Sequence, residues 1–97
     1  MPAYVIIKIQ TNDAAKLKPY QEIAPKIVDK FDGKMLIRGG EVLSLEGINE
    51  GRRIVMIEFE TLNKAKEFYH SNEYQKAINL RKDVADFEII AVDGLNN

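Results

Sequence analysis

Hydrophobic and polar residues alternate with two periodicities along the chain. One has a period of two residues, and the other has the spacing of three to four residues of a helix. The segment Ala3–Ile9 is short, apolar and rich in β-branched residues, which predicts a strand. Apolar side chains then recur at steps of three and four residues: Leu17, Tyr20, Ala24, Ile27 and Phe31. This spacing predicts a helix that begins at Pro19, where a missing N–H costs nothing, after a loose turn over residues 13–17. Pro25 is expected to kink this helix.

The middle of the chain predicts a pair of strands. Residues 34–46 have the pattern of one long strand, interrupted by Gly39 and Gly40. Paired glycines within a strand favour a bulge or a sharp bend. Residues 47–51 are expected to form a hairpin loop, and residues 52–59 the third strand.

The second half of the chain repeats the strand–helix–strand order. Thr61 is expected to cap a second helix, and Ser71 a further short helix. The apolar stripe of the second helix contains four residues: Leu62, Ala65, Phe68 and Tyr69. Residues 87–93 predict the last strand, and the tail over residues 94–97 is expected to fray.

This order of elements predicts a ferredoxin-like α+β fold. The sequence β-α-β-β-α-β is the split βαβ motif, a four-stranded antiparallel sheet with its helices on one face. A chain of 97 residues has room for one hydrophobic core. Residues 1–97 are therefore expected to form a single domain.

Strand side chains alternate between the two faces of a sheet, so the strand residues divide into two sets. Val5, Ile7 and Ile9 are expected to meet the helices. The opposite face then carries polar side chains among apolar ones: Tyr4, Ile6, Lys8, Leu36, Arg38, Ile54, Met56 and Glu58. That face is too apolar for water and too polar for a plain core. We therefore predict a homodimer in which two sheets pack face to face and enclose a small-molecule pocket.

The chemistry expected in this pocket depends on Arg38 and Glu58. The pairing expected along the hairpin places Arg38 opposite Phe59 and beside Glu58. Arg38 would bind a carboxylate or enolate, and Glu58 would orient it or act as a general base. Tyr4 or Tyr20 would donate a hydrogen bond. The alternative is a structural ion pair of Arg38 and Glu58 that fixes the register of the sheet or of the dimer.

Composition narrows the range of partners. Lys and Arg total 14 and Asp and Glu total 15, so the net charge is -1, which argues against a nucleic-acid partner. No apolar run approaches the roughly 18 residues of a membrane span. The apolar N-terminal run is broken at Lys8 and follows no basic region, so it does not predict a signal peptide. We expect a cytoplasmic protein without a membrane segment.

The chain has no cysteine and one histidine, His70. Disulfides and thiolate metal sites are excluded, and we expect neither a metal site nor a cofactor. His70 is the obvious general acid or base, because an unperturbed histidine titrates near neutrality. It lies near the end of the second predicted helix, so the alternative is a surface histidine that interacts with the helix C-terminus.

Residues spread over nearly the whole chain match a known family in their order and spacing: Tyr20, Ile23, Ala24, Pro25, Gly33, Arg38, Gly39, Gly40, Glu58, Phe59, Ala65, Tyr69, Ser71, Glu73, Tyr74, Gln75 and Arg81. Together they resemble the uncharacterised family called domain of unknown function 1330. Asp32 and Asn72 depart from the family pattern, which often has Gly and Pro there; both lie in predicted turns.

The resemblance implies a dimeric α/β-barrel assembly. That architecture is shared with cofactor-free monooxygenases, muconolactone-isomerase-like enzymes and haem-handling enzymes, and a shared fold does not give function. The resemblance also adds Tyr20, Tyr74 and Arg81 as candidate ligand-binding residues, with Arg81 paired to an acidic group or to the partner subunit. We predict a small cofactor-free protein that binds or acts on an organic acid or aromatic compound. The alternative is a non-catalytic ligand-binding or structural homodimer.

Overall fold

The strands and helices follow one another in the predicted order. The computed structural model describes residues 1–95, so the last two residues of the tail predicted to fray, Asn96 and Asn97, lie outside the described residues. The elements are β1 (Ala3–Thr11), the 3-10 helix η1 (Ala14–Leu17), α1 (Lys18–Lys30), β2 (Lys34–Arg38), β3 (Arg53–Phe59), α2 (Leu62–His70), α3 (Asn72–Ile78) and β4 (Ala85–Asp93).

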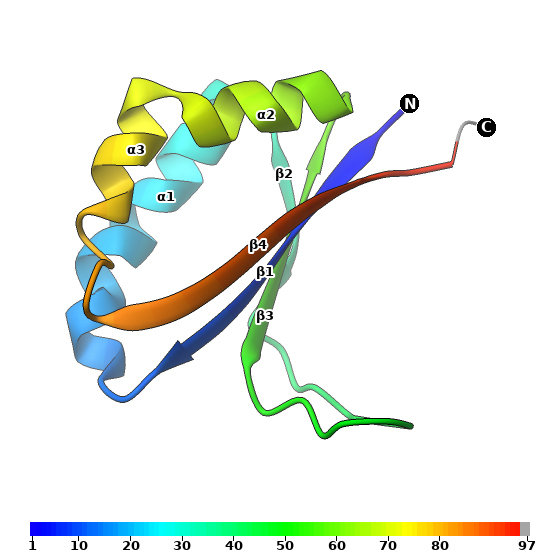
Figure 1. Cartoon of the computed structure of the whole chain (residues 1–97). Coiled ribbons are helices and arrows are strands. Elements are labelled where there is room, and N and C mark those ends of the chain that lie inside the picture. The colour runs from blue at the N-terminus through cyan, green and yellow to red at the C-terminus, as the bar shows by residue number, and fades with distance from the viewer. Residues whose placement is uncertain (96–97) are drawn as a thin grey trace.

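The strands form one antiparallel four-stranded sheet with the order β2-β3-β1-β4. Figure 1 shows α1, α2 and α3 on one side of this sheet, while the other side carries no helix. The predicted ferredoxin-like α+β fold is confirmed. We call the side without helices the open face.

Local signals in the sequence explain where the helices begin. Pro19 lies in the first turn of α1, which begins one residue earlier than predicted, at Lys18. The Thr61 hydroxyl accepts a hydrogen bond from the Lys64 N–H at 3.0 Å at the start of α2. The Ser71 hydroxyl accepts one from the Tyr74 N–H at 3.1 Å at the start of α3. Both predicted caps therefore satisfy N–H groups that a helix leaves free at its first turn.

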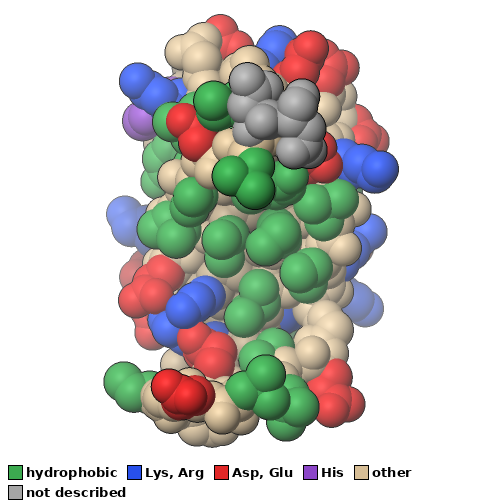
Figure 2. All heavy atoms as spheres, turned by 90° about the vertical axis from the view of Figure 1, so that its right-hand side faces the viewer, with side chains coloured by type: hydrophobic (Ala, Val, Ile, Leu, Met, Phe, Trp, Pro, Cys, Tyr) green, Lys and Arg blue, Asp and Glu red, His purple; other side chains and the backbone are tan. Residues whose placement is uncertain are grey.

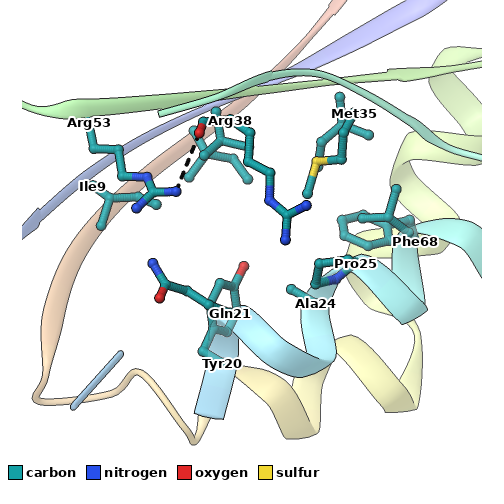
Figure 3. Close-up of a pocket in the computed structure, with 13 residues that line it drawn as sticks. Ile9, Tyr20, Gln21, Ala24, Pro25, Met35, Arg38, Arg53 and Phe68 are labelled. Atoms are coloured by element: carbon teal, nitrogen blue, oxygen red, sulfur yellow. Dashed lines mark hydrogen bonds between the residues drawn. The ribbon is translucent and has the colours of Figure 1, made fainter. Parts of the chain in front are cut away.

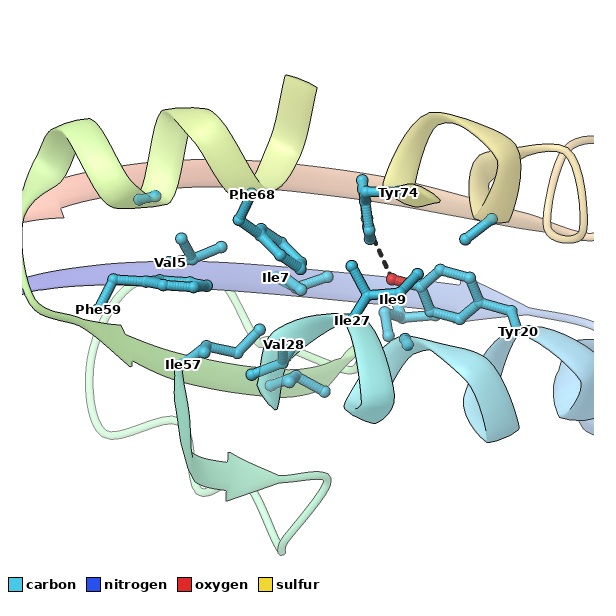
Figure 4. Close-up of a cluster of buried hydrophobic side chains, with 14 of the residues drawn as sticks. Val5, Ile7, Ile9, Tyr20, Ile27, Val28, Ile57, Phe59, Phe68 and Tyr74 are labelled. Atoms are coloured by element: carbon cyan, nitrogen blue, oxygen red, sulfur yellow. Dashed lines mark hydrogen bonds between the residues drawn. The ribbon is translucent and has the colours of Figure 1, made fainter. Parts of the chain in front are cut away.

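The core lies between the helices and the sheet. Val5, Ile7 and Ile9 point from β1 toward the helices, and each is buried (Figure 4). Phe59 and Phe68 pack ring to ring, with their centroids 5.0 Å apart. This single buried cluster fixes which face of every strand turns away from water.

The second strand is much shorter than predicted. β2 ends at Arg38, and residues 39–52 form a long loop instead of continuing the strand to Glu46. Gly39 has φ +78°, a left-handed conformation that ends the extended run. Because β3 begins only at Arg53, residues 41–46 have no strand of the described sheet beside them. The apolar alternation in this segment therefore belongs to a loop.

A bulge also lies elsewhere than predicted, and it moves Arg38 to the other face. Met35 pairs with Ile57, but Ile37 pairs with Met56 and Arg38 with Val55, so the register shifts within β2 at Leu36. Val55 is buried on the helix side. Its partner Arg38 therefore lies on the helix side, because side chains of paired residues share a face. The predicted position of Arg38 on the open face, opposite Phe59 and beside Glu58, is wrong.

Replacement of Gly33 tests how tightly the core is packed where α1 meets β2. A Cβ at this position would lie 2.7 Å from Val28 Cγ1 and 2.8 Å from a Phe59 ring carbon. We expect Gly33→Ala to lower the free energy of unfolding by about 1–3 kcal/mol, as overpacking of a core does. Urea unfolding measures this change. Gly40→Ala is the control, because no atom outside Gly40 and its two chain neighbours lies within 4 Å of the new Cβ. Equal losses in both variants would contradict the packing argument.

Candidate functional site

A cleft with two arginines lies between α1 and the strands β2 and β3. We call it the arginine cleft. Its volume is about 190 Å³, and its polar lining includes Gln21, Arg38 and Arg53. The other walls are mostly apolar, with Ile9, Ala24, Pro25, Met35, Val55 and Phe68 among them. Figure 3 shows the Arg38 side chain extending from the sheet toward α1, so its guanidinium lies between the two layers.

The positive charge of this cleft is not neutralised within the described residues. Neither Arg38 nor Arg53 forms an ion pair with a carboxylate there. Arg53 instead donates a long hydrogen bond of 3.5 Å to the carbonyl oxygen of Arg38. A guanidinium carries five donors in a planar fork that matches a carboxylate or phosphate. The Arg38 guanidinium is therefore free to bind an anion.

Behind the cleft, three polar side chains meet in the core, and we call them the tyrosine–arginine cluster: Tyr20, Tyr74 and Arg81. The hydroxyl oxygens of Tyr20 and Tyr74 are 2.7 Å apart (Figure 4). Arg81 donates from Nη2 to the Tyr74 hydroxyl at 3.4 Å. Its guanidinium also lies 3.9 Å from the ring centroid of Phe87, a cation–π contact. Three predicted ligand-binding residues, of which Tyr20 is far from the other two in the sequence, thus form one hydrogen-bonded chain.

Burial affects the pKa of Tyr20 in this cluster. Arg81 is 8% exposed, and its Nε has no hydrogen-bond partner among the described residues. Desolvation raises the pKa of Tyr20 far above its ordinary value, and the neighbouring Tyr74 adds to the rise, while Arg81 opposes it. Tyr20 therefore keeps its proton at neutral pH and can donate a hydrogen bond. Tyr20 also lines the arginine cleft, so the cluster reaches that cleft from behind.

The other predicted site residues lie elsewhere. Tyr4 and Glu58 are cross-strand partners on the open face, so the structure brings these two together. Arg38 lies on the opposite side of the sheet from Glu58, and the predicted contact between them is absent. His70 is the exposed last residue of α2, with its ring against Tyr69 at a centroid distance of 5.2 Å.

Sequence reasoning missed Gln21, Arg53 and Phe87. Arg53 had a signal, because it stands two residues before Val55 and therefore shares its face. Gln21 follows Tyr20 at the start of α1, and no motif marks it. Phe87 begins the predicted last strand, but its contact with Arg81 depends on how α3 packs, which no local pattern gives.

A group of charged side chains lies at one end of the open face. Glu50 accepts two hydrogen bonds from the Arg52 guanidinium, at 2.8 and 3.0 Å, and Lys8 lies 3.1 Å from its carboxylate. Arg52 also pairs with Glu88 at 2.7 Å. The hydrogen bonds from Arg52 and Lys8 lower the pKa of Glu50 from 4.5 to about 2. These pairs anchor the end of the loop over residues 39–52 to the sheet.

The rest of the open face is strongly apolar. Figure 2 looks onto this face and shows hydrophobic side chains covering its centre. Ile37, Ile90 and Val92 are 40%, 57% and 46% exposed. The loop over residues 39–52 adds Leu45 and Ile48, which are 87% and 95% exposed. In Figure 1 this loop projects beyond the sheet on the side away from the helices.

Two further findings concern metals and membranes. Within residues 1–95, no group of three or more His, Cys, Asp or Glu side chains is placed to hold a metal ion. No helix of the described chain is long and apolar enough to cross a membrane. A cytoplasmic location, the lack of a cofactor and the lack of a nucleic-acid partner stay predictions.

The fold is that of the ferredoxin-like α+β domains. Residues 2–95 match the model of a family described as Domain of unknown function (DUF1330), so the chain belongs to this family. The predicted family is thus confirmed. None of the curated proteins matches the chain.

Solved structures share this fold at low sequence identity. A protein of unknown function from Rhodopseudomonas palustris is 15% identical, with a TM-score of 0.74 over 99% of this chain and 84% of the other. SnoaB, a cofactor-independent oxygenase from Streptomyces nogalater, is 5% identical, with a TM-score of 0.67 over 99% and 95%. A dimeric protein of unknown function from Bacteroides fragilis is 12% identical, with a TM-score of 0.64 over 96% of both chains. At these identities the likeness shows the fold.

The lowered pKa of Glu50 gives a pH dependence that can be measured. Because its pKa is about 2 in the folded chain, ionised Glu50 stabilises the fold above pH 4.5, and this contribution disappears as the pH falls toward 2. We expect Glu50→Gln to lower the melting temperature at pH 7 and to have no effect near pH 2. Thermal unfolding across this range measures the difference. Glu46→Gln, in the same loop, is the control; a difference independent of pH would contradict the ion pairs.

Proposed function

We propose that this protein is a homodimer that binds a small organic acid in the arginine cleft of each subunit. One observation carries the proposal: Arg38 places a guanidinium without a carboxylate partner among the described residues into a largely apolar cleft. Arg38 was already the predicted anion ligand. Arg38 keeps this role here, but on the helix side of the sheet rather than on the open face.

The lining of the cleft supports an organic acid over an inorganic anion. Arg38 can pair with a carboxylate through two parallel hydrogen bonds. Met35, Pro25 and Phe68 then offer apolar contact to the rest of the ligand. A volume of about 190 Å³ suits a single ring or a short chain. Small aromatic or branched carboxylates therefore fit both the charge and the walls.

The open face supports the homodimer. A contiguous apolar surface of this kind marks an interaction site, and the structurally similar Bacteroides fragilis protein is dimeric. Two open faces packed together would cover Ile37, Ile90 and Val92. The exposed Leu45 and Ile48 lie on a loop that projects past this face, where a partner's sheet would contact them.

A cofactor-free enzyme is the second candidate function. Tyr20 keeps its proton beside the cationic cleft, and a neutral hydroxyl next to a guanidinium can stabilise negative charge that develops on a bound oxygen. The structural similarity to a cofactor-independent oxygenase is compatible with such chemistry. The non-catalytic alternative predicts that bound acids are recovered unchanged. Incubation of the protein with a panel of aromatic acids in air, followed by NMR, separates the two.

Benzoate is a suitable probe for the cleft. We expect benzoate to shift the NMR signals of Arg38, Gln21 and Met35, while benzyl alcohol, which lacks the charge, binds at least about tenfold more weakly. Arg38→Met should weaken benzoate binding about tenfold or more, because a charge-assisted hydrogen bond contributes about 1.5–3 kcal/mol. Lys26→Met, on the exposed side of α1, is the control for the lost charge. Equal affinities in both variants would refute the role of Arg38.

The dimer is tested by placing a charge on the open face. Ile37 on β2 and Ile23 on α1 are 40% and 41% exposed, so they form a matched pair. We expect Ile37→Glu to weaken dimerisation roughly a hundredfold or more, because an unpaired carboxylate buried in an interface costs about 3 kcal/mol or more. Ile23→Glu should leave the dimer intact. Analytical ultracentrifugation measures both; a wild-type mass of 11.1 kDa at micromolar concentration would overturn the dimer.

A further inference from the structure

We infer that Arg81 and Tyr74 hold the Tyr20 hydroxyl so that its proton points into the arginine cleft, where it binds an acceptor oxygen of the ligand. The inference rests on the proposed function for the ligand. The orientation itself follows from the cluster and can be tested in the free protein. It gives Tyr20 the role of a ligand-binding donor and makes Tyr74 and Arg81 positioning residues.

Arg81 favours one direction for the chain of hydrogen bonds. A guanidinium has only donors, so in the contact of 3.4 Å the Tyr74 oxygen must accept. The Tyr74 proton is then free to point at Tyr20, whose oxygen lies 2.7 Å away. Tyr20 accepts that bond and keeps its own proton for another partner.

The opposite direction is electrostatically unfavourable. If Tyr20 donated to Tyr74, the Tyr74 proton would turn toward the buried cation of Arg81 or lose its partner. Arg81 is 92% buried and forms no ion pair with the described residues, so its charge is little screened. The arrangement Arg81 to Tyr74 to Tyr20 therefore has the lower energy.

The cleft is the place where the Tyr20 proton can find its partner. Tyr20 lines the cleft. Figure 3 shows its hydroxyl directed from α1 toward the sheet, from which the Arg38 side chain extends in the opposite direction. A ligand oxygen at this point would receive one hydrogen bond from Tyr20 and would lie near the guanidinium of Arg38. Such a site requires an acceptor and rejects a donor. This narrows the ligand class to acids that present a carboxylate or carbonyl oxygen to Tyr20.

A double-mutant cycle with benzoate tests the positioning role. We expect Tyr20→Phe to weaken binding about tenfold and Tyr74→Phe about threefold, since a hydrogen bond contributes about 0.5–1.5 kcal/mol. Because Tyr74 acts through Tyr20, the double variant should bind no more weakly than Tyr20→Phe alone. Tyr69→Phe, whose ring also packs on Tyr74, is the control and should bind as the wild type does. Additive losses, or wild-type binding by Tyr20→Phe, would overturn the inference.

A second measurement needs no ligand. In the free protein, the Tyr74 hydroxyl proton should exchange slowly with water and the Tyr20 hydroxyl proton quickly, and benzoate should slow the exchange of the latter. Proton NMR of the tyrosine hydroxyls in the folded wild-type protein measures this difference. The reverse order of exchange would refute the orientation even if benzoate binds. If the expected order is found and benzoate does not bind, the proposed ligand is wrong and the orientation stands.

Discussion

A side chain in a strand must lie on one face of the sheet or on the other, and in β2 a single extra residue decides which face Arg38 takes. The bulge at Leu36 shifts the register between Met35 and Ile37. Ile37 then joins the apolar open face, and Arg38 turns toward the helices. Without this bulge the two residues would exchange faces. The cleft would lose one of its two arginines, and the open face would gain a charge at its edge.

Most of the fold follows from local signals in the sequence. Val5, Ile7 and Ile9 alternate along β1 and therefore identify the face that packs on the helices. Hydroxyl side chains at Thr61 and Ser71 mark the starts of α2 and α3. The bulge has no such signal, because Met35, Leu36 and Ile37 are all apolar and suit either face. The end of β2 was missed for a related reason. Residues 41–46 have the composition of a strand, but a strand also needs a neighbour, and β3 begins too late to provide one.

The sequence indicates several individual residues of the candidate site, but it does not show how they lie together. Tyr20, Tyr74 and Arg81 were singled out, yet nothing local shows that they meet, since Tyr20 and Tyr74 are 54 residues apart. Their contact depends on the packing of α1 against α3. Tyr4 and Glu58 share the open face, as predicted, because β1 and β3 pair without a bulge. Arg38 is predicted opposite Phe59 but pairs with Val55, four residues away along β3, because the loop between β2 and β3 is longer than predicted.

In the proposed dimer, the open face forms the interface and the helix side of the sheet carries the arginine cleft. The loop over residues 39–52 connects the two. It starts directly after Arg38, with the Gly39 N–H bonded to the Ile54 carbonyl oxygen at 2.9 Å, and ends at the ion pairs of Glu50. Its middle carries Leu45 and Ile48 into solvent. A partner subunit that covers these side chains would fix the middle of the loop between its two anchored ends. In the proposed dimer, assembly on the open face would thereby also restrain the backbone that positions Arg38 on the other.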